Sequence, residues 1–181
     1  AIERLNQVLS APERKDVDET VTHGFRAETM SGIILQDVSF GYTEGQPVLK
    51  QIDLKLERHK TYAFVGSSGH GKSTLFRLLS GLEEDYTGQI SLEKNSAIVP
   101  QNAFLFHGTI AENIGIGRAG AEADDIVNAA IAAGIHDKIN SLSEKYDTII
   151  GESGAGLSGG EKQRICIARA LLSEADVLLL D

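Results

Sequence analysis

The spacing of apolar and polar residues along the chain predicts strands that alternate with helices. Residues 34–40 alternate in part, and residues 52–57 alternate cleanly between apolar and polar side chains, so both segments are expected to be strands. The short apolar run 61–65 is expected to be a strand that leads into a glycine-rich stretch. The apolar run 177–180 is expected to be a buried strand.

Three segments have the periodicity of helices. Residues 72–80 are helical in pattern and are followed by Gly81, a residue type that often ends helices. Residues 109–142 are helical and alanine-rich but are interrupted by glycines at positions 115, 117, 120 and 134. Residues 161–173 are expected to form one further helix.

Residues 89–92 and 96–99 are expected to pair with each other as a β-hairpin. Because strands and helices interleave along the chain, the fold class is predicted to be α/β. A helical insert is expected at about residues 104–165.

The first thirty residues have a different character. Apolar residues at helical spacing within 2–9 predict a short amphipathic helix that Pro12 ends. Residues 13–29 are polar without a clear period, which is typical of a linker. We therefore expect two parts, residues 1–30 and residues 31–181.

Composition narrows the class of protein. Hydrophobic residues make up 41% of the 181 residues and charged residues 24%, as in soluble globular proteins. The net charge of −9 argues against a nucleic-acid partner, which would need a basic surface. The single cysteine, Cys166, excludes an intramolecular disulfide framework and fits a reducing compartment. No run of eighteen apolar residues and no signal-peptide core is present, so the chain is expected to be cytoplasmic in character.

The most specific motif is a glycine-rich segment between the expected strand 61–65 and the expected helix 72–80. It matches G-x-x-x-x-G-K-[ST] and reads Gly66-Ser67-Ser68-Gly69-His70-Gly71-Lys72-Ser73-Thr74. Glycines let the backbone curl so that successive N–H groups face phosphate oxygens, and the following helix adds positive charge at its N-terminus. The motif therefore predicts a nucleotide site.

Individual roles follow from the chemistry of this loop. Lys72 is expected to bridge the β- and γ-phosphates, and the Ser73 hydroxyl to ligate Mg²⁺. His70 stands at a variable position and is expected to contribute only its backbone. The plain alternative is a glycine-rich turn that caps a helix and leaves Lys72 in solvent.

A second candidate anion site comes from Leu157-Ser158-Gly159-Gly160-Glu161, just before the expected helix 161–173. Ser158 and Glu161 have the spacing of a capping box, which explains those two residues alone. The paired glycines expose backbone N–H groups at a helix N-terminus, where anions bind. Two such sites far apart in one chain suggest that the second serves a nucleotide held by another subunit.

Residues 157–161 resemble the signature motif of ATP-binding cassette proteins, and the resemblance extends from about Ile33 to Asp181. In that family the signature of one cassette completes the ATP site of another, so Ser158, Gly159 and Gly160 would contact a γ-phosphate across the interface. The family's usual residue at position 161 is glutamine. Glu161 places a carboxylate near a phosphate, so we expect phosphate binding by this segment to be mildly weakened.

The resemblance assigns three further site residues. Tyr42 would be the platform for the adenine ring, against the alternative of part-buried packing at a strand end. Gln101 resembles the Q-loop glutamine that ligates Mg²⁺ and orients water, against the alternative of an ordinary loop residue. Asp181, at the end of strand 177–180, would be the Walker B carboxylate that holds Mg²⁺. The implied fold is a P-loop core with an antiparallel β subdomain and a helical insert.

Several segments resemble those of exporters in this family. Residues 148–154 are similar to the X-loop, in which Glu152 would meet the ends of transmembrane helices, and residues 109–114 have a similar character although they also form a plain capping box. The helix at 2–9 resembles the tail of a last transmembrane helix, or is a surface helix. The resemblance implies a membrane domain fused on the N-terminal side and a place at the cytoplasmic face of the plasma or inner membrane.

Two departures from the family were found. The expected hairpin is shorter than its family counterpart, and the sequence stops at Asp181, where the family continues with a catalytic glutamate, a D-loop and a switch histidine. We therefore expect a C-terminally truncated cassette that is weak or inactive alone. Three functions fit the sequence: an ATP-hydrolysing exporter cassette, a cassette that binds but does not hydrolyse ATP, and a soluble cassette protein without a membrane partner.

Overall fold

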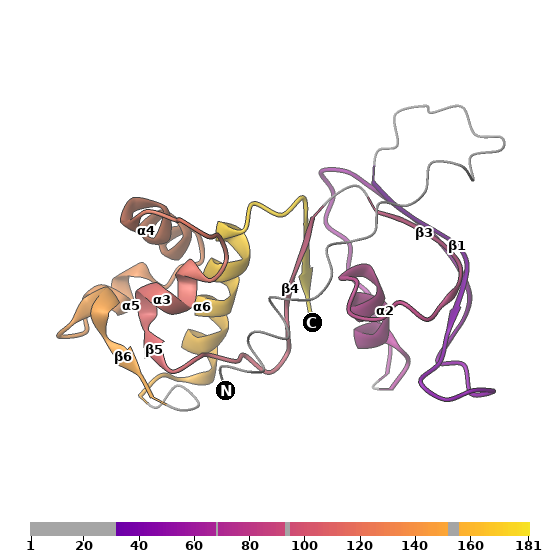
Figure 1. Ribbon diagram of the computed structural model, residues 1–181, viewed down its shortest axis with the longest axis horizontal. Coiled ribbons are helices and arrows are strands. Elements are labelled where there is room, and N and C mark those ends of the chain that lie inside the picture. The colour runs from indigo at the N-terminus through magenta and orange to yellow at the C-terminus, as the bar shows by residue number, and fades with distance from the viewer. Residues whose placement is uncertain (1–31, 68, 93–94, 152–155) are drawn as a thin grey trace. The chain divides into compact units, whose positions relative to one another are not determined.

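The computed structural model describes residues 32–67, 69–92, 95–151 and 156–181. The predicted helix at 2–9, the linker, Ser68 and the X-loop residue Glu152 therefore lie outside the described residues. The antiparallel part, the phosphate-loop helix and the helical cluster can all be followed in Figure 1.

The first sheet is antiparallel and has the strand order β2-β1-β3. It contains β1 (Gly32–Phe40), β2 (Leu49–Glu57) and β3 (Thr87–Leu92). This confirms the strands predicted at 34–40 and 52–57. The turn after β1 is tight, because a Cβ atom at Gly41 would lie 2.5 Å from the carbonyl oxygen of Gln46.

A second, parallel pair joins β4 (Ser96–Val99) to β7 (Val177–Leu180), with Ser96 opposite Val177. The predicted hairpin is therefore wrong, because β3 pairs with β1 and β4 pairs with β7. The strand at 177–180 is confirmed, but its uniform burial is not. Leu179 is buried, whereas 55% of Leu180 is exposed.

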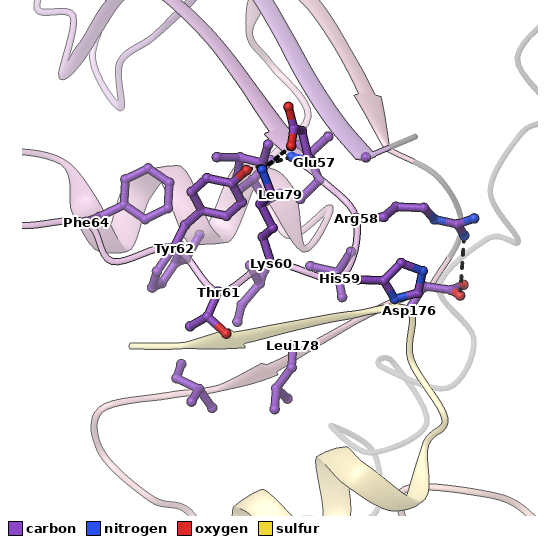
Figure 2. A pocket seen from close by; sticks show the side chains of 17 residues that line it. Glu57, Arg58, His59, Lys60, Thr61, Tyr62, Phe64, Leu79, Asp176 and Leu178 are labelled. Atoms are coloured by element: carbon purple, nitrogen blue, oxygen red, sulfur yellow. Dashed lines mark hydrogen bonds and ion pairs between the residues drawn. The ribbon is translucent and has the colours of Figure 1, made fainter. Parts of the chain in front are cut away.

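The predicted strand at 61–65 is wrong. These residues form no ladder, and 91% of Val65 is exposed. Tyr62 instead accepts a hydrogen bond through its hydroxyl from the Glu57 N–H at 2.9 Å, and Glu57 also pairs with Lys60. Figure 2 shows this segment along one wall of a cavity of about 500 Å³ that β7 lines on another side. Without a neighbouring strand, an apolar run cannot form the hydrogen bonds of a sheet.

Helix α2 (Lys72–Leu79) packs its apolar face into the core of the first sheet. Its Leu75, Leu78 and Leu79 are buried in one cluster with side chains of β1 and β2 and with Leu179 of β7. The predicted helix 72–80 is confirmed. Burial of this face is what fixes the start of α2, and with it the end of the phosphate loop.

A second core is formed by the helices that follow Gln101. The elements are β5 (Gly108–Thr109), α3 (Ile110–Gly115), α4 (Ala123–Ala132), α5 (His136–Asn140), η2 (Lys145–Asp147), β6 (Ile149–Ile150) and α6 (Gly159–Leu172). The helical prediction for 109–142 is confirmed, and the breaks fall at the expected glycines: α3 ends at Gly115, and Gly134 follows α4 with φ +67°. Among the described residues, no helix is long and apolar enough to cross a bilayer.

The side chains of Asn113 and Arg169 tie α3, α6 and the segment before α3 together. Asn113 is 1% exposed and bonds both the N–H and the carbonyl of Phe106 at 2.8 and 2.9 Å. The Arg169 guanidinium donates to the Asn113 carbonyl at 2.8 Å and lies 5.4 Å from the centre of the Phe106 ring. Because it is largely buried, the pKa of Arg169 is lowered.

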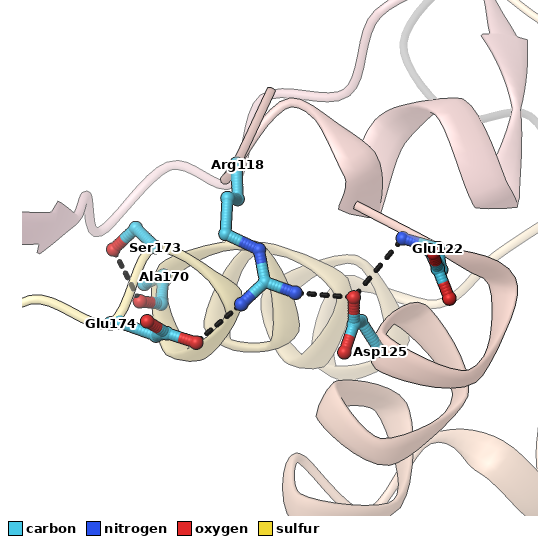
Figure 3. A network of polar contacts seen from close by, with 6 residues as sticks. All are labelled: Arg118, Glu122, Asp125, Ala170, Ser173 and Glu174. Atoms are coloured by element: carbon cyan, nitrogen blue, oxygen red, sulfur yellow. Dashed lines mark hydrogen bonds and ion pairs between the residues drawn. The ribbon is translucent and has the colours of Figure 1, made fainter. Parts of the chain in front are cut away.

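Arg118 links the start of α4 to the end of α6, as Figure 3 shows. Its guanidinium pairs with Asp125 and Glu174, and Asp125 also accepts a hydrogen bond from the Glu122 N–H at 3.1 Å. That backbone bond, followed by the contact with Arg118, keeps the pKa of Asp125 below its ordinary value. The ion pairs fix the loop between α3 and α4 against α6.

We expect Gly117→Ala to destabilise the protein, because an added Cβ atom would lie 2.1 Å from the Arg169 carbonyl oxygen. Overpacking of this kind costs about 1–3 kcal/mol. The matched control is Gly115→Ala, where the nearest added contact is an ordinary 3.7 Å to Ile126. Denaturant titration of both variants measures the difference, and equal midpoints would contradict the close packing at Gly117.

Candidate nucleotide-binding site

The phosphate loop curls around the side chain of its own lysine. The Lys72 ammonium donates to the carbonyls of Gly66 and Ser67 at 2.8 and 2.9 Å. Gly69 and Gly71 have φ values of +83° and +80°, a backbone region that L residues rarely adopt. Gly71 also forms the N-cap of α2, so these glycines let the chain turn sharply into the helix.

The start of α2 is arranged as an anion site. The N-cap of this helix is Gly71, which has no side chain to accept a hydrogen bond from the first N–H groups. Gly66 and Gly69 are exposed, and added Cβ atoms there would meet nothing within 4 Å, so the face of the loop is open. Open backbone donors beside the positive end of a helix favour a bound phosphate.

The end of β7 meets the start of α2 at this loop. The Ser73 hydroxyl donates to Asp181 Oδ1 at 2.8 Å, although 108 residues separate the two in sequence. Asp181 is itself fixed by a hydrogen bond from its N–H to the Val99 carbonyl at 3.0 Å. The sequence-predicted hydroxyl and carboxylate are thus brought into contact.

Ser73 and Asp181 fit a magnesium ion by their chemistry. Mg²⁺ prefers oxygen ligands and is usually held by one or two carboxylates together with substrate phosphates. Among the described residues, no group of three or more His, Cys, Asp or Glu side chains could hold a metal by itself. The protein therefore offers one hydroxyl and one carboxylate beside the phosphate loop. These are the oxygen ligands expected for a Mg²⁺ ion that the protein shares with substrate phosphates.

Tyr42 lies beside the phosphate-loop helix, and 59% of it is exposed. Its hydroxyl is 3.3 Å from the hydroxyl of buried Thr74, and its ring meets that of Phe40 edge-on at 5.0 Å. These two contacts orient the ring while leaving much of it open. An exposed, oriented aromatic ring is suited to stacking on a base.

Gln101 and His70 are the two remaining candidate residues. Gln101 is exposed in a bend two residues after Val99. The His70 Nδ1 is 3.2 Å from the Ser67 carbonyl, so the histidine side chain folds back on the loop. This agrees with a backbone contribution from His70.

The signature segment, residues 157–161, begins helix α6 as a capping box. The Ser158 hydroxyl accepts from the Glu161 N–H at 3.3 Å, and Glu161 Oε2 accepts from the Ser158 N–H at 2.7 Å. Ser158, Gly159 and Gly160 are all exposed. An added Cβ atom at Gly159 would meet nothing within 4 Å, and one at Gly160 would meet only the Arg164 guanidinium at 3.9 Å. Packing among the described residues therefore does not explain the glycine pair.

The two anion sites belong to different cores. Helix α2 packs into the sheet core, whereas α6 packs into the helical core. The structure brings together Tyr42, Lys72, Ser73, Thr74 and Asp181, and it leaves the signature segment facing outward on the other core.

Sequence reasoning missed two charged residues. Arg169 lies in the apolar face of α6 among buried Cys166, Ala168 and Ala170, and a cation inside an apolar stripe was the available signal. Lys138 of α5 forms an ion pair with Glu161 at 3.3 Å. No local sequence pattern predicts this ion pair, because 23 positions separate the two residues.

Comparison with known proteins matches a family model described as "ABC transporter" to residues 49–181. The iron-sulfur clusters transporter ABCB7, mitochondrial, of Danio rerio is 45% identical over 82% of this chain and 22% of its own length. The ATP-dependent lipid A-core flippase of Syntrophus aciditrophicus is 41% identical over 94% of this chain and 30% of its own length. A bacterial Atm1-family ABC exporter, solved with ATP bound, superimposes with a TM-score of 0.80 at 34% identity, over 99% of this chain and 33% of that one. The chain thus spans about a fifth to a third of the length of the relatives it matches.

Proposed function

Because this chain belongs to the ABC transporter family, as an ATP-binding cassette of the exporter type, we propose that it hydrolyses MgATP to drive export across a membrane. The observation that carries the proposal is the Ser73–Asp181 contact at the phosphate loop. It joins a hydroxyl and a carboxylate at the point where the γ-phosphate and its metal would lie. ATP binding is common to the family, and turnover is the proposed step.

Each residue of the loop has a defined task in this proposal. The backbone N–H groups of residues 66–74 bind the phosphates, and Lys72 exchanges its two carbonyl partners for β- and γ-phosphate oxygens. Ser73 and Asp181 hold Mg²⁺, which when bound neutralises charge that develops on the phosphates. Gln101 orients the attacking water without adding charge. Catalysis is then mainly positioning and electrostatic stabilisation.

A second cassette completes the site. The open glycine pair of the signature segment has no packing role among the residues that the structure describes, which supports a surface that another molecule approaches closely. The Ser158 hydroxyl accepts a bond from the Glu161 N–H, so its own proton stays available for an incoming phosphate oxygen. We propose that two cassettes enclose two nucleotides between phosphate loop and signature.

The exporter setting rests on the relatives. This chain spans about a fifth to a third of the matched exporters, so we propose that the membrane domain and the residues that bind the transported substrate lie outside these 181 residues. We propose the cytoplasmic face of the cell membrane as the location. One relative is a mitochondrial transporter, so this cassette design serves more than one membrane.

The test is phosphate release by the complete protein that carries this cassette, purified in lipid nanodiscs. Saturable release that stops when EDTA removes Mg²⁺ is expected. Tight MgATP binding without release would instead support the binding-only cassette. Recovery of the protein with nucleic acid, away from membranes, would support the soluble cassette, and absence of both binding and release would contradict the proposal.

We expect Tyr42→Ala to weaken ATP binding, because it removes the exposed ring beside Thr74. Loss of one stacked base costs about 1–3 kcal/mol, which is roughly a 5- to 150-fold change in Kd. Tyr42→Phe keeps the ring and is expected to stay close to wild type. Titration with a fluorescent ATP analogue measures both, and an unchanged Kd for Tyr42→Ala would place the adenine elsewhere.

A further inference from the structure

The signature segment carries a charge that its proposed task disfavours. A capping box accepts glutamine or glutamate equally well, because either side chain can take the hydrogen bond from the N-cap N–H. Glu161 fills that position here, and its Oε2 accepts from the Ser158 N–H at 2.7 Å. The cap therefore does not require the negative charge, which would repel a triphosphate brought to this helix end.

Lys138 meets this charge from a different helix. Its ammonium lies 3.3 Å from Glu161 Oε1, the carboxylate oxygen that the Ser158 N–H does not occupy. Both oxygens of Glu161 are thus engaged, one by the chain backbone and one by a cation. The Glu161 side chain is 20% exposed and that of Lys138 40%, so solvent screens the pair only in part.

We propose that Lys138 is a positioning residue that neutralises Glu161, holds it against the helix cap and so keeps the signature segment able to receive the γ-phosphate of a second cassette. This inference rests on the proposed function, since it concerns the same site. Lys138 acts through Glu161 and does not touch the nucleotide.

The state of the carboxylate supports this role. The hydrogen bond from the Ser158 backbone, followed by the contacts with the Ser158 side chain and with Lys138, keeps the pKa of Glu161 below its ordinary value. Glu161 is then ionised at neutral pH, so its charge cannot be removed by protonation. A fixed cation is the remaining way to offset it.

The experiment is a double-mutant cycle in the complete protein, with KM for MgATP, kcat and the thermal midpoint measured for each variant. Lys138→Met, which keeps the length of the side chain, is expected to raise KM about threefold to fivefold, the upper range for a partly exposed ion pair. The value of kcat should stay near wild type, because only binding is weakened. Lys138→Arg should restore the wild-type KM. The thermal midpoint should stay the same in the variants whose KM changes.

The deciding comparison uses Glu161→Gln as the background. In that background Lys138→Met is expected to leave KM unchanged, because no charge remains to be neutralised. An equal rise of KM in both backgrounds would show that Lys138 contacts the nucleotide directly, and no rise in either would show that the ion pair has no part in binding. Both outcomes overturn the inference.

Failure of the proposed function looks different. Lys72→Ala is carried alongside: if the unsubstituted protein turns over ATP and Lys72→Ala does not, the proposed function stands whatever Lys138 does. If the unsubstituted protein neither binds nor hydrolyses ATP, the proposed function itself has failed.

Discussion

Lys72→Ala is expected to abolish ATP turnover by the complete protein. The Lys72 ammonium lies inside the curl of the phosphate loop, where it is bonded to two loop carbonyls. Its loss removes the charge that offsets the β- and γ-phosphates. Removal of one such group costs about 10²–10³ in kcat, and more where phosphate binding is also lost.

Phosphate release and MgATP binding should be measured for this variant together. The matched control is Lys55→Ala, which removes the same charge from an exposed position on β2. The control is expected to keep its turnover. Normal hydrolysis by Lys72→Ala would refute the assignment of the loop, because Lys72 is the only lysine or arginine between residues 66 and 74.

Gly160→Asp is expected to stop turnover while leaving the fold intact. Space for the new side chain exists within the chain, since only the Arg164 guanidinium lies within 4 Å of the added Cβ atom. An aspartate in the first turn of α6 also interacts favourably with the helix dipole, by about 0.3–1 kcal/mol. The new carboxylate would lie where the γ-phosphate of the ATP bound to the second cassette must approach, and it would repel that phosphate.

The informative contrast is between stability and activity. The thermal midpoint of Gly160→Asp should equal or exceed that of the parent, while phosphate release falls to background. Gln163→Glu adds the same charge to an exposed position further along α6 and should retain activity. Full turnover by Gly160→Asp would mean that the signature segment does not face a nucleotide.

Local features of this fold could be predicted from sequence because local interactions determine them. Two of the capping boxes, Thr109 with Glu112 and Ser158 with Glu161, follow from the side chains and spacing alone. Helix α2 and strand β2 show clear periodicity, and strand β1 shows it in part. The breaks in the helical region fall at glycines, whose positions are visible in the sequence.

Features that depend on distant partners could not be predicted in this way. Strand β4 looked like half of a hairpin with β3, but its partner β7 begins 81 residues after Ser96. The run 61–65 has the composition of a strand, yet a strand also needs a neighbour with which to pair, and composition does not report one. Sequence patterns indicate which segments can form strands but not which strands pair with one another.

The candidate site also has features that the sequence predicts and features that it does not. The phosphate loop and the signature segment were found because each is a continuous motif. The contacts of Ser73 with Asp181 and of Tyr42 with Thr74 join residues far apart, so the motifs predicted the participants and the structure supplied the geometry. No sequence motif predicts the Lys138–Glu161 pair, which only the folded structure brings together.

The most direct test of the central claim is an electron cryomicroscopy structure of the complete protein with MgATP and vanadate. The account predicts a nucleotide whose phosphates contact the N–H groups of residues 66–74 and Lys72, with Ser73 and Asp181 at the metal and the signature segment of a second cassette on the γ-phosphate side. A nucleotide bound away from this loop, or a signature segment that faces no nucleotide, would contradict it.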